Sequence, residues 1–167
     1  MRIQQLHIKG NDRFPNNERL PVLLYVKVLD IPTLFPARTV KGIFNTNNWR
    51  NSWYSGIYTF HHYHSITHEV MGVCKGKTTL MLGGEEGTLL TISKGDVLII
   101  PAGVAHKNMQ REKDVMCVGA YPDGRDYDIK KGLRTERPEA DLHIAMLELP
   151  KADPVFGSHG ELQRFWK

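Results

Sequence analysis

Histidines are concentrated in one short stretch of the sequence. Residues 61–76, HHYHSITHEVMGVCKG, hold four of the chain's eight histidines, and a glutamate directly follows the last of the four. In an extended chain, side chains alternate between two faces, so His62 and His64 share one face about 7 Å apart. Two imidazoles on one face suit two ligands of a single ion. The pattern therefore predicts a metal site with a further ligand from another strand.

The identity of the next ligand depends on strand register. His68 and Glu69 begin the following apolar run, and a shift by one residue exchanges which of them faces inward. If Glu69 faces inward, Met71 and Val73 share its face and form an apolar lining. We therefore favour Glu69 as the ligand and keep His68 as the reserve ligand.

A second stretch downstream contains a further histidine. Residues 95–108, GDVLIIPAGVAHKN, place His106 just after a Pro-x-Gly turn. Written in full, the two patterns are Gly56-x5-His62-x-His64-x4-Glu69-x6-Gly76 and Gly95-x5-Pro101-x-Gly103-x2-His106.

These two patterns match both motifs of the cupin superfamily, which the sequence resembles over residues 56–108. One departure lies at the end of the second motif. The family often has Asn four residues after the histidine, whereas this chain has Gln110 there and Asn108 two residues earlier. The departure leaves the metal ligands intact and weakens any substrate role assigned to that Asn by analogy.

The resemblance implies that the motif residues meet on the inner face of a small barrel. Gly76 and Gly95 are expected where strands turn, with positive φ, and the Pro101 to Gly103 turn directs the following histidine inward. A buried carboxylate without a compensating cation costs several kcal/mol, so the group is expected to hold one divalent ion, Fe, Mn, Ni, Co or Zn. The expected ligands are His62, His64, Glu69 and His106.

The other elements are expected to form an all-β domain. Residues 21–31 indicate an early strand and residues 37–49 one short helix before the barrel core. Later strands, bounded by glycine or proline, are expected at 56–64, 68–76, 77–84, 87–95, 96–103, 105–110 and 114–122, followed by a charged loop at 122–140 and a return to the sheet at 141–149. Regular short strands indicate an antiparallel sandwich or barrel, and the resemblance specifies the double-stranded β-helix, or jelly roll, of an RmlC-like small bacterial cupin.

Composition narrows the class of partner. The 167 residues, 41% of them hydrophobic, fit a single domain over 1–167. The net charge of +4 comes from 22 basic and 18 acidic residues that interleave, which is typical of a solvated surface and not of a nucleic-acid partner. The sequence has no signal-peptide core and no apolar run of membrane-spanning length, so we expect a cytoplasmic protein without a membrane partner. Cys74 and Cys117 are expected as buried hydrophobic residues without a disulfide.

Residues beyond the ligands give candidate pocket positions. Arg125 could bind a carboxylate or phosphate, although a solvated loop is the favoured interpretation of its surroundings. Tyr58 and Phe60 share the parity of His62 and could line the cavity. His61 and Tyr63 would then face solvent or a subunit interface, and the resemblance implies a homodimer. The candidates at the pocket mouth are Tyr121, Asp123, Arg125, Asp126, Tyr127 and Asp128.

The leading hypothesis is a metal-dependent enzyme that acts on a small polar organic molecule. Four protein ligands leave two positions of an octahedral ion free, which suits either a dioxygenase or an isomerase or lyase in which Glu69 or a pocket residue moves a proton. Candidate catalytic residues are Glu69, Tyr121 and Arg125. The alternative is a metal-containing binding or sensor domain without turnover, and the cupin fold alone does not choose between them.

Overall fold

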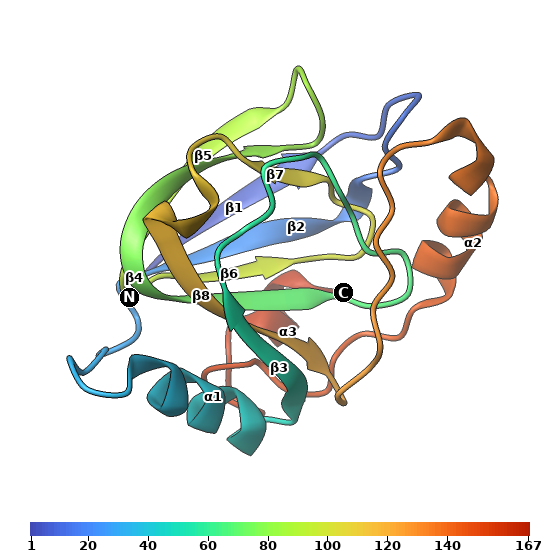
Figure 1. The fold of residues 1–167 in the computed structure, drawn as a ribbon. Coiled ribbons are helices and arrows are strands. Elements are labelled where there is room, and N and C mark those ends of the chain that lie inside the picture. The colour runs from blue at the N-terminus through green and yellow to red at the C-terminus, as the bar shows by residue number, and fades with distance from the viewer.

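Eight antiparallel strands curve into a barrel (Figure 1). The computed structural model describes residues 1–167. The strands follow the order β1-β2-β6-β4-β8-β3, and β5 and β7 both pair with β4. The all-β class with antiparallel jelly-roll topology is therefore confirmed. The strand bounds are β1 Arg2–Ile8, β2 Asn17–Val26, β3 Trp49–Ser55, β4 Glu69–Leu82, β5 Thr88–Ser93, β6 Val97–Ile100, β7 His106–Asn108 and β8 Val115–Pro122.

Strand β4 links the two halves of the barrel. Its first part pairs with β6 and β8, and its second part, from Lys77 onward, pairs with β5 and β7. The expected break at Gly76 is wrong, because the strand runs through this residue. Its φ of 76° is nevertheless positive, as are those of Gly95 and Gly103, both 94°. A left-handed residue bends the strand here and lets it pass from one sheet to the other.

The first part of β4 is buried on both faces. Met71 and Val73 contribute to the cluster inside the barrel, whereas Val70 and Cys74 contribute to a second cluster outside it. Because both faces are covered, this segment is continuously apolar instead of alternating. Cys117 lies in the inner cluster, on the face opposite to Cys74, and both thiols are free and buried as expected.

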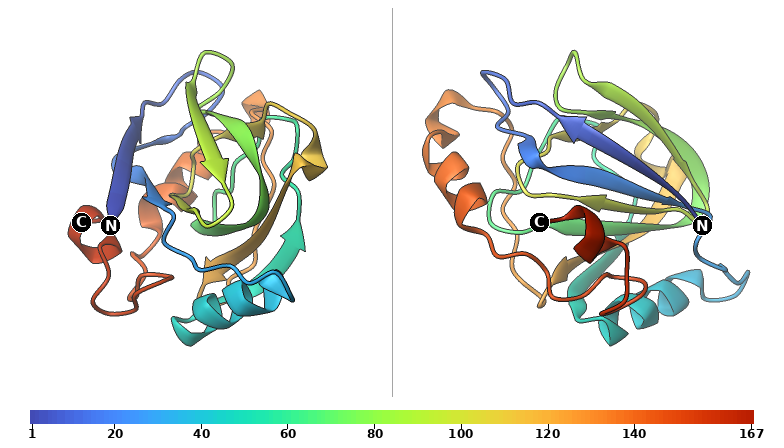
Figure 2. Two further views of the ribbon diagram at one scale, coloured as in Figure 1. Left: turned by 90° about the vertical axis from the view of Figure 1, so that its left-hand side faces the viewer. Right: turned by 180° about the vertical axis from the view of Figure 1, so that it is seen from behind.

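Helices cover the outer cluster. Helix α1, Pro36–Thr46, confirms the expected helix, and its Val40 and Phe44 pack against the sheet. The C-terminal segment runs across the same side in Figure 2, where the short α3, Leu162–Phe165, precedes Trp166. The indole of Trp166 donates a hydrogen bond to the Pro21 carbonyl over 2.9 Å, which fixes this segment on β2.

The expected strand at 141–149 is wrong. Residues Glu139–Met146 form helix α2, which lies at the right-hand end of the barrel in Figure 1. Ala140 and Ile144, four residues apart, place one helical face on a small cluster around Phe14. The negative charges of Glu139 and Asp141 in the first turn also stabilise the helix by interacting with the positive end of its dipole. The preceding charged stretch is largely irregular, as expected, with a 3-10 turn at Arg134–Glu136.

The segment 56–64 does not form the expected strand, and its backbone bends at residues 59 and 60. Its backbone pairs only at isolated bridges, His62 with His106 and Tyr63 with Lys130. Because these partners belong to different segments, no continuous ladder forms. Tyr63 is fully buried, contrary to the expectation of solvent or an interface, and its hydroxyl donates to Glu136 over 2.9 Å. His61 is half-buried beside Phe14.

No helix of the structure is both long and apolar enough to span a membrane.

Candidate metal centre

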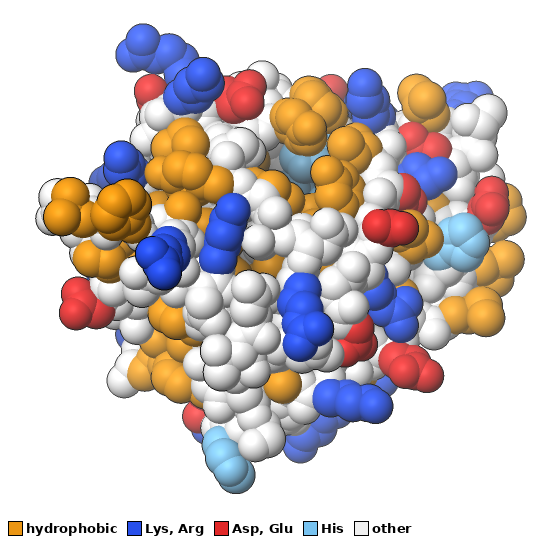
Figure 3. Space-filling model, turned by 60° about the horizontal axis from the view of Figure 1, so that its bottom comes forward, with side chains coloured by type: hydrophobic (Ala, Val, Ile, Leu, Met, Phe, Trp, Pro, Cys, Tyr) orange, Lys and Arg blue, Asp and Glu red, His pale blue; other side chains and the backbone are white.

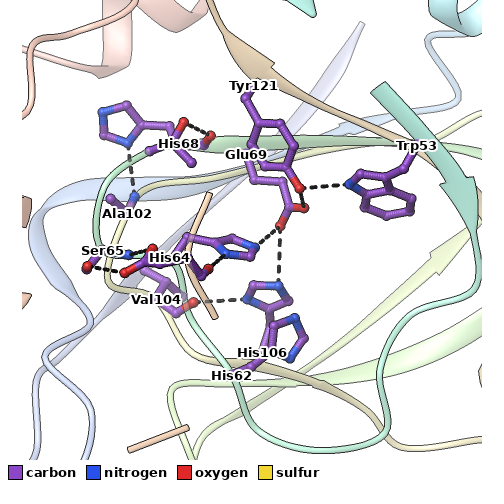
Figure 4. A network of polar contacts seen from close by, with 12 residues as sticks. Trp53, His62, His64, Ser65, His68, Glu69, Ala102, Val104, His106 and Tyr121 are labelled. Atoms are coloured by element: carbon purple, nitrogen blue, oxygen red, sulfur yellow. Dashed lines mark hydrogen bonds and ion pairs between the residues drawn. The ribbon is translucent and has the colours of Figure 1, made fainter. Parts of the chain in front are cut away.

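Three histidines from two separate segments converge inside the barrel. His62 and His64 come from the extended segment before β4, and His106 begins β7. One ring nitrogen from each lies within 4.8 Å of the others, and all three side chains are buried. The paired backbone amides and carbonyls of His62 and His106, at 2.9 and 3.2 Å, hold the two segments together. The cluster is seen from close by in Figure 4.

The hydrogen bonds of these rings orient the opposite nitrogen toward the cluster. Each Nδ1 faces a backbone carbonyl: His62 that of Phe60 at 3.0 Å, and His106 that of Val104 at 3.0 Å. His64 Nδ1 likewise faces the Asp128 carbonyl. A carbonyl only accepts, so each Nδ1 carries the proton and each neutral ring has its lone pair on Nε2. This is the tautomer that a metal ligand requires.

Glu69 adds a carboxylate to the three imidazoles. Its Oε2 atom lies 3.3 Å from His64 Nε2 and 3.4 Å from His106 Nε2. The same oxygen is buried and has no hydrogen-bond donor, while Oε1 accepts from the Tyr121 hydroxyl at 3.2 Å. Atoms that all carry lone pairs repel one another at this separation unless a proton or a metal ion lies between them.

Burial and neighbouring groups shift the pKa values of the cluster residues. Burial lowers the pKa of His62 to about 3, so its imidazole is neutral at pH 7. Burial alone would lower the pKa of His64, but the adjacent Glu69 carboxylate raises it above the usual value. Burial alone would raise the pKa of Glu69, but His64 and His106 hold it well below the ordinary range. Glu69 is therefore ionised, and without a metal the compensating charge is a proton on an imidazole.

The loop after β8 supports the cluster from outside. The Asp128 carboxylate accepts from the Ser65 amide at 2.7 Å, and its carbonyl accepts from His64. Gly103, in the Pro-x-Gly turn, donates its amide to the His64 carbonyl over 2.8 Å. Of the acidic residues expected at the pocket mouth, Asp128 thus has an identifiable task, because it positions a ring of the cluster. Asp123 and Asp126 are exposed and do not line the cavity.

His68 faces away from the cluster. Its Nδ1 accepts a hydrogen bond from the Ala102 amide over 2.9 Å, so the proton of its neutral ring is on Nε2. The ring packs against Trp166 in the outer cluster, with centroids 4.8 Å apart. The structure therefore has the register in which Glu69 points inward, and His68 does not approach the other three histidines.

A cavity of about 130 Å³ opens over the cluster. Tyr121 is fully buried in its wall, and Tyr58 and Tyr127 are each 42% exposed at its edge. Arg125 is exposed and does not line the cavity, which agrees with the favoured interpretation of a solvated loop and not with a role at the pocket mouth. Phe60 also lies outside the lining. The lining residues are Trp53, Ser55, Gly56, Ile57, Tyr58, His62, His64, Glu69, Met71, His106, Tyr121 and Tyr127.

Trp53 and Ile57 are lining residues that the sequence analysis missed. The Trp53 indole donates to the Tyr121 hydroxyl over 2.8 Å and lies across Gly119, where an added Cβ would come within 2.0 Å of the ring. Gly119 in an otherwise apolar strand was the available signal, since such a glycine often marks close approach of another group.

The donor set suits a divalent transition metal. Three neutral imidazoles and one carboxylate are the ligands that Fe, Mn, Co, Ni and Zn accept, and the unpaired Glu69 oxygen lacks only a cation. Together, the antiparallel barrel, the two motifs and the inward position of their residues agree with the fold and site that the resemblance to the cupin superfamily implies.

Comparison with known proteins extends this assignment. The chain is 36% identical over 163 residues to "Uncharacterized protein YjlB" of Bacillus subtilis (strain 168), which covers 98% of this chain and 96% of that protein. The chain therefore belongs to the same protein family as YjlB. No family model matches the chain.

Solved cupin structures are more distant. An acireductone dioxygenase from Bacillus anthracis, with a cadmium ion in its active centre, is 12% identical, with 55% of this chain and 61% of that one covered and a TM-score of 0.39. The epimerase RmlC from Legionella pneumophila is 12% identical, with coverages of 75% and 73% and a TM-score of 0.36. A Bacillus subtilis oxalate decarboxylase variant is 18% identical, with coverages of 88% and 37% and a TM-score of 0.39. At these scores the similarities carry no argument, and the resemblance to cupins depends on the motifs and their geometry.

Proposed function

We propose that this cupin is a metal-dependent enzyme acting on a small polar organic molecule, with one divalent ion held by His62, His64, Glu69 and His106. The observation that carries the proposal is the common orientation of the three imidazoles. Each Nδ1 faces a backbone carbonyl, so the three Nε2 atoms converge, and those of His64 and His106 lie 3.3 and 3.4 Å from the buried Glu69 carboxylate. A role in the core alone does not require lone pairs to face one another.

The residues around the ligands have distinct tasks. A bound divalent ion would supply Lewis-acid or redox chemistry and polarise an oxygen of the substrate. Glu69 offsets one of its charges, and the Tyr121 hydroxyl fixes which carboxylate oxygen faces the histidines. Burial and the nearby Glu69 raise the pKa of Tyr121, so the phenol keeps its proton and remains a hydrogen-bond donor. The apolar Met71 and Ile57 exclude water from the inner wall.

Metal content tests the ligand assignment. Natively purified protein should carry about one divalent ion per chain, and His64→Ala or His106→Ala should lose it. Ligand binding to the folded state alone stabilises it, so loss of an ion present at about 100 times its Kd costs about 2.7 kcal/mol, or about 5–10 °C in Tm. His143→Ala, on the exposed surface of α2, is the matched control. Full occupancy and unchanged melting in both cluster variants would contradict the assignment.

Reconstitution then tests the reaction class. Metal-free protein is loaded separately with Fe(II), Mn(II), Co(II) or Zn(II) and assayed with and without air over sugars, diketones and thiols. Turnover with Zn(II) under nitrogen indicates an isomerase or lyase, whereas turnover restricted to Fe(II) in air indicates a dioxygenase. No turnover with any ion, together with tight binding of one compound, would favour the binding or sensor domain. The homodimer and the cytoplasmic location stay predictions.

A further inference from the structure

Aromatic rings form two walls beside the histidine cluster. On one side, Tyr121 and Tyr127 stack with centroids 4.8 Å apart and an interplanar angle of 22°. Tyr127 also meets the ring of His64 edge-on, at 5.4 Å and 71°. The Tyr121 hydroxyl is already engaged with Glu69 and Trp53. These two hydrogen bonds hold the Tyr121 ring in place. Of the two stacked tyrosines, only Tyr127 has a hydroxyl without a hydrogen bond to the protein.

A second stacked pair comes from another segment, and of its two rings Tyr58 lines the cavity whereas Phe60 lies outside the lining. Tyr58 and Phe60 stack at 4.9 Å and 21°, and Tyr58 meets the ring of His62 edge-on at 5.2 Å and 76°. The hydroxyl of Tyr58 also makes no hydrogen bond to the protein. Figure 3 shows a histidine recessed among hydrophobic side chains on this face of the molecule. The cavity thus combines aromatic walls with two available phenol hydroxyls.

The lining contains no lysine, arginine or aspartate, and its only charged side chain besides the histidines is Glu69. Lys131 lies 5.0 Å over the Phe60 ring and is outside the lining. A phosphate or second carboxylate within these walls would lose hydration without gaining a cationic partner, which costs several kcal/mol. The metal would therefore be the only cation in the cavity, and the Glu69 carboxylate would offset one of its positive charges.

The cavity is small but opens to solvent. Its volume of about 130 Å³ is slightly less than that of an enclosed apolar cavity of about 150 Å³ that holds benzene. Four protein ligands on an octahedral ion leave two positions, which two oxygen atoms of one small molecule could occupy.

We infer that the ligand is a small molecule, neutral in solution, with two neighbouring oxygens, such as a hydroxy-ketone, a diketone or a hydroxamic acid, and without a phosphate or carboxylate group. This inference rests on the proposed function. The oxygens reach the metal, the carbon skeleton lies between the two aromatic walls, and Tyr58 and Tyr127 bind any outer polar group. Phosphorylated sugars and nucleotide sugars are excluded as ligands of this site.

The test uses two chelators with the same hydroxamate group, one of which also carries a phosphonate. Co(II)-loaded protein, with its metal content measured first, is titrated with acetohydroxamic acid and with phosphonoacetohydroxamic acid, and binding is followed by the visible spectrum of Co(II). Affinities of both compounds for free Co(II) provide the reference. We expect acetohydroxamic acid to bind and the phosphonate to bind at least about tenfold more weakly, relative to that reference.

Two arginine variants test the cause of this selectivity. Ser55→Arg adds a cation at the exposed edge of the lining, and should raise affinity for the phosphonate and reduce the difference. Thr59→Arg adds the same charge on the exposed surface outside the lining and should leave the difference unchanged.

Equal or tighter binding of the phosphonate by unmodified protein would overturn the inference. If neither compound binds while the metal is retained, the inference also fails, but the proposed metal site stands. Protein that cannot be loaded with metal would instead overturn the proposed function, and the inference with it.

Discussion

Two of the buried carboxylates of the molecule, Asp153 and Glu69, have contrasting surroundings. Asp153, near the C-terminus, accepts hydrogen bonds from the Tyr25 hydroxyl at 2.6 Å and from the amides of Val155, Phe156 and Leu162 at 2.8 to 3.1 Å. Glu69, inside the barrel, accepts one hydrogen bond from Tyr121, and its other oxygen has no donor.

This difference separates a structural carboxylate from one that needs a cation. Donors to both oxygens offset the desolvation of Asp153, so its charge holds the C-terminal segment on the sheet without any ion. Glu69 instead faces imidazole nitrogens whose protons are on the far side of the rings, and only a proton or metal ion completes its environment. Burial of a carboxylate is therefore uninformative by itself, and the identity of the facing atoms indicates its role.

The largest expected effect contrasts these two carboxylates. Glu69→Gln should lower metal affinity by at least about 100-fold. Loss of a charged ligand should cost more affinity than mutation of a residue that only hydrogen-bonds to a ligand, which typically costs about 10- to 100-fold. Asp153→Asn should leave metal affinity unchanged but lower the Tm of metal-free protein by about 5–10 °C. The substitution turns one of the two oxygens, which together accept four hydrogen bonds, into an NH2 group that cannot accept them. Metal titration and calorimetry of both variants provide the comparison.

Two results would break this contrast. Equal metal affinity of Glu69→Gln and unmodified protein would remove Glu69 from the ligand set. Loss of metal in folded Asp153→Asn would show that the C-terminal segment shapes the metal site, so the role of Asp153 would not be structural alone.

A second effect concerns His68, which is adjacent to Glu69 in sequence but lies on the outer face. Burial lowers the pKa of His68 to about 4. In the unfolded chain the same group takes up a proton near pH 6.5, so the unfolded state binds more protons between these values and stability falls as pH falls from about 6.5 to 4. The full effect is on the order of 3 kcal/mol.

His68→Gln should remove this acid sensitivity while metal content is retained. The measurement is the Tm of metal-free protein across pH 4 to 6.5, where the variant should show a flatter dependence. His62 is present in both proteins, so its contribution to the pH dependence of stability cancels in the comparison. A steeper metal loss in His68→Gln than in Glu69→Gln would mean that His68 is the ligand after all.

The smallest expected effect refines the role of Tyr121. Tyr121→Phe removes the hydroxyl between Glu69 and the Trp53 indole and should weaken metal binding by about tenfold, with a loss of about 1 kcal/mol in stability. Tyr54→Phe, on the partly exposed face of β3, is the control. An unchanged metal affinity in Tyr121→Phe would indicate that the carboxylate is oriented by the histidines alone.

Some errors of the sequence analysis arise from the same source. Residues 56–64 have the composition of a strand, and 141–149 alternate weakly between apolar and polar positions. Local pattern does not reveal whether a partner strand is available, and neither segment has one in the barrel. The helix face of Ala140 and Ile144 becomes meaningful only because Phe14 lies beside it.

The sequence by itself determined the types of ligand and their spacing. Alternation of side chains along the chain, which is local, put His62 and His64 on one face, and the apolar parity of Met71 and Val73 indicated that Glu69 faces inward. The convergence of His106 with these residues was expected from the resemblance of the two motifs to those of the cupin superfamily.

Only the tertiary structure decided the tautomers and the cavity walls. The carbonyl that orients His64 belongs to Asp128, and the wall includes Trp53 beside Tyr121, a residue 68 positions away. Nothing in local spacing determines such meetings, because they occur when the barrel closes and segments far apart in sequence become neighbours. The chemistry of the ligands is thus encoded locally, whereas what the site accepts depends on long-range packing.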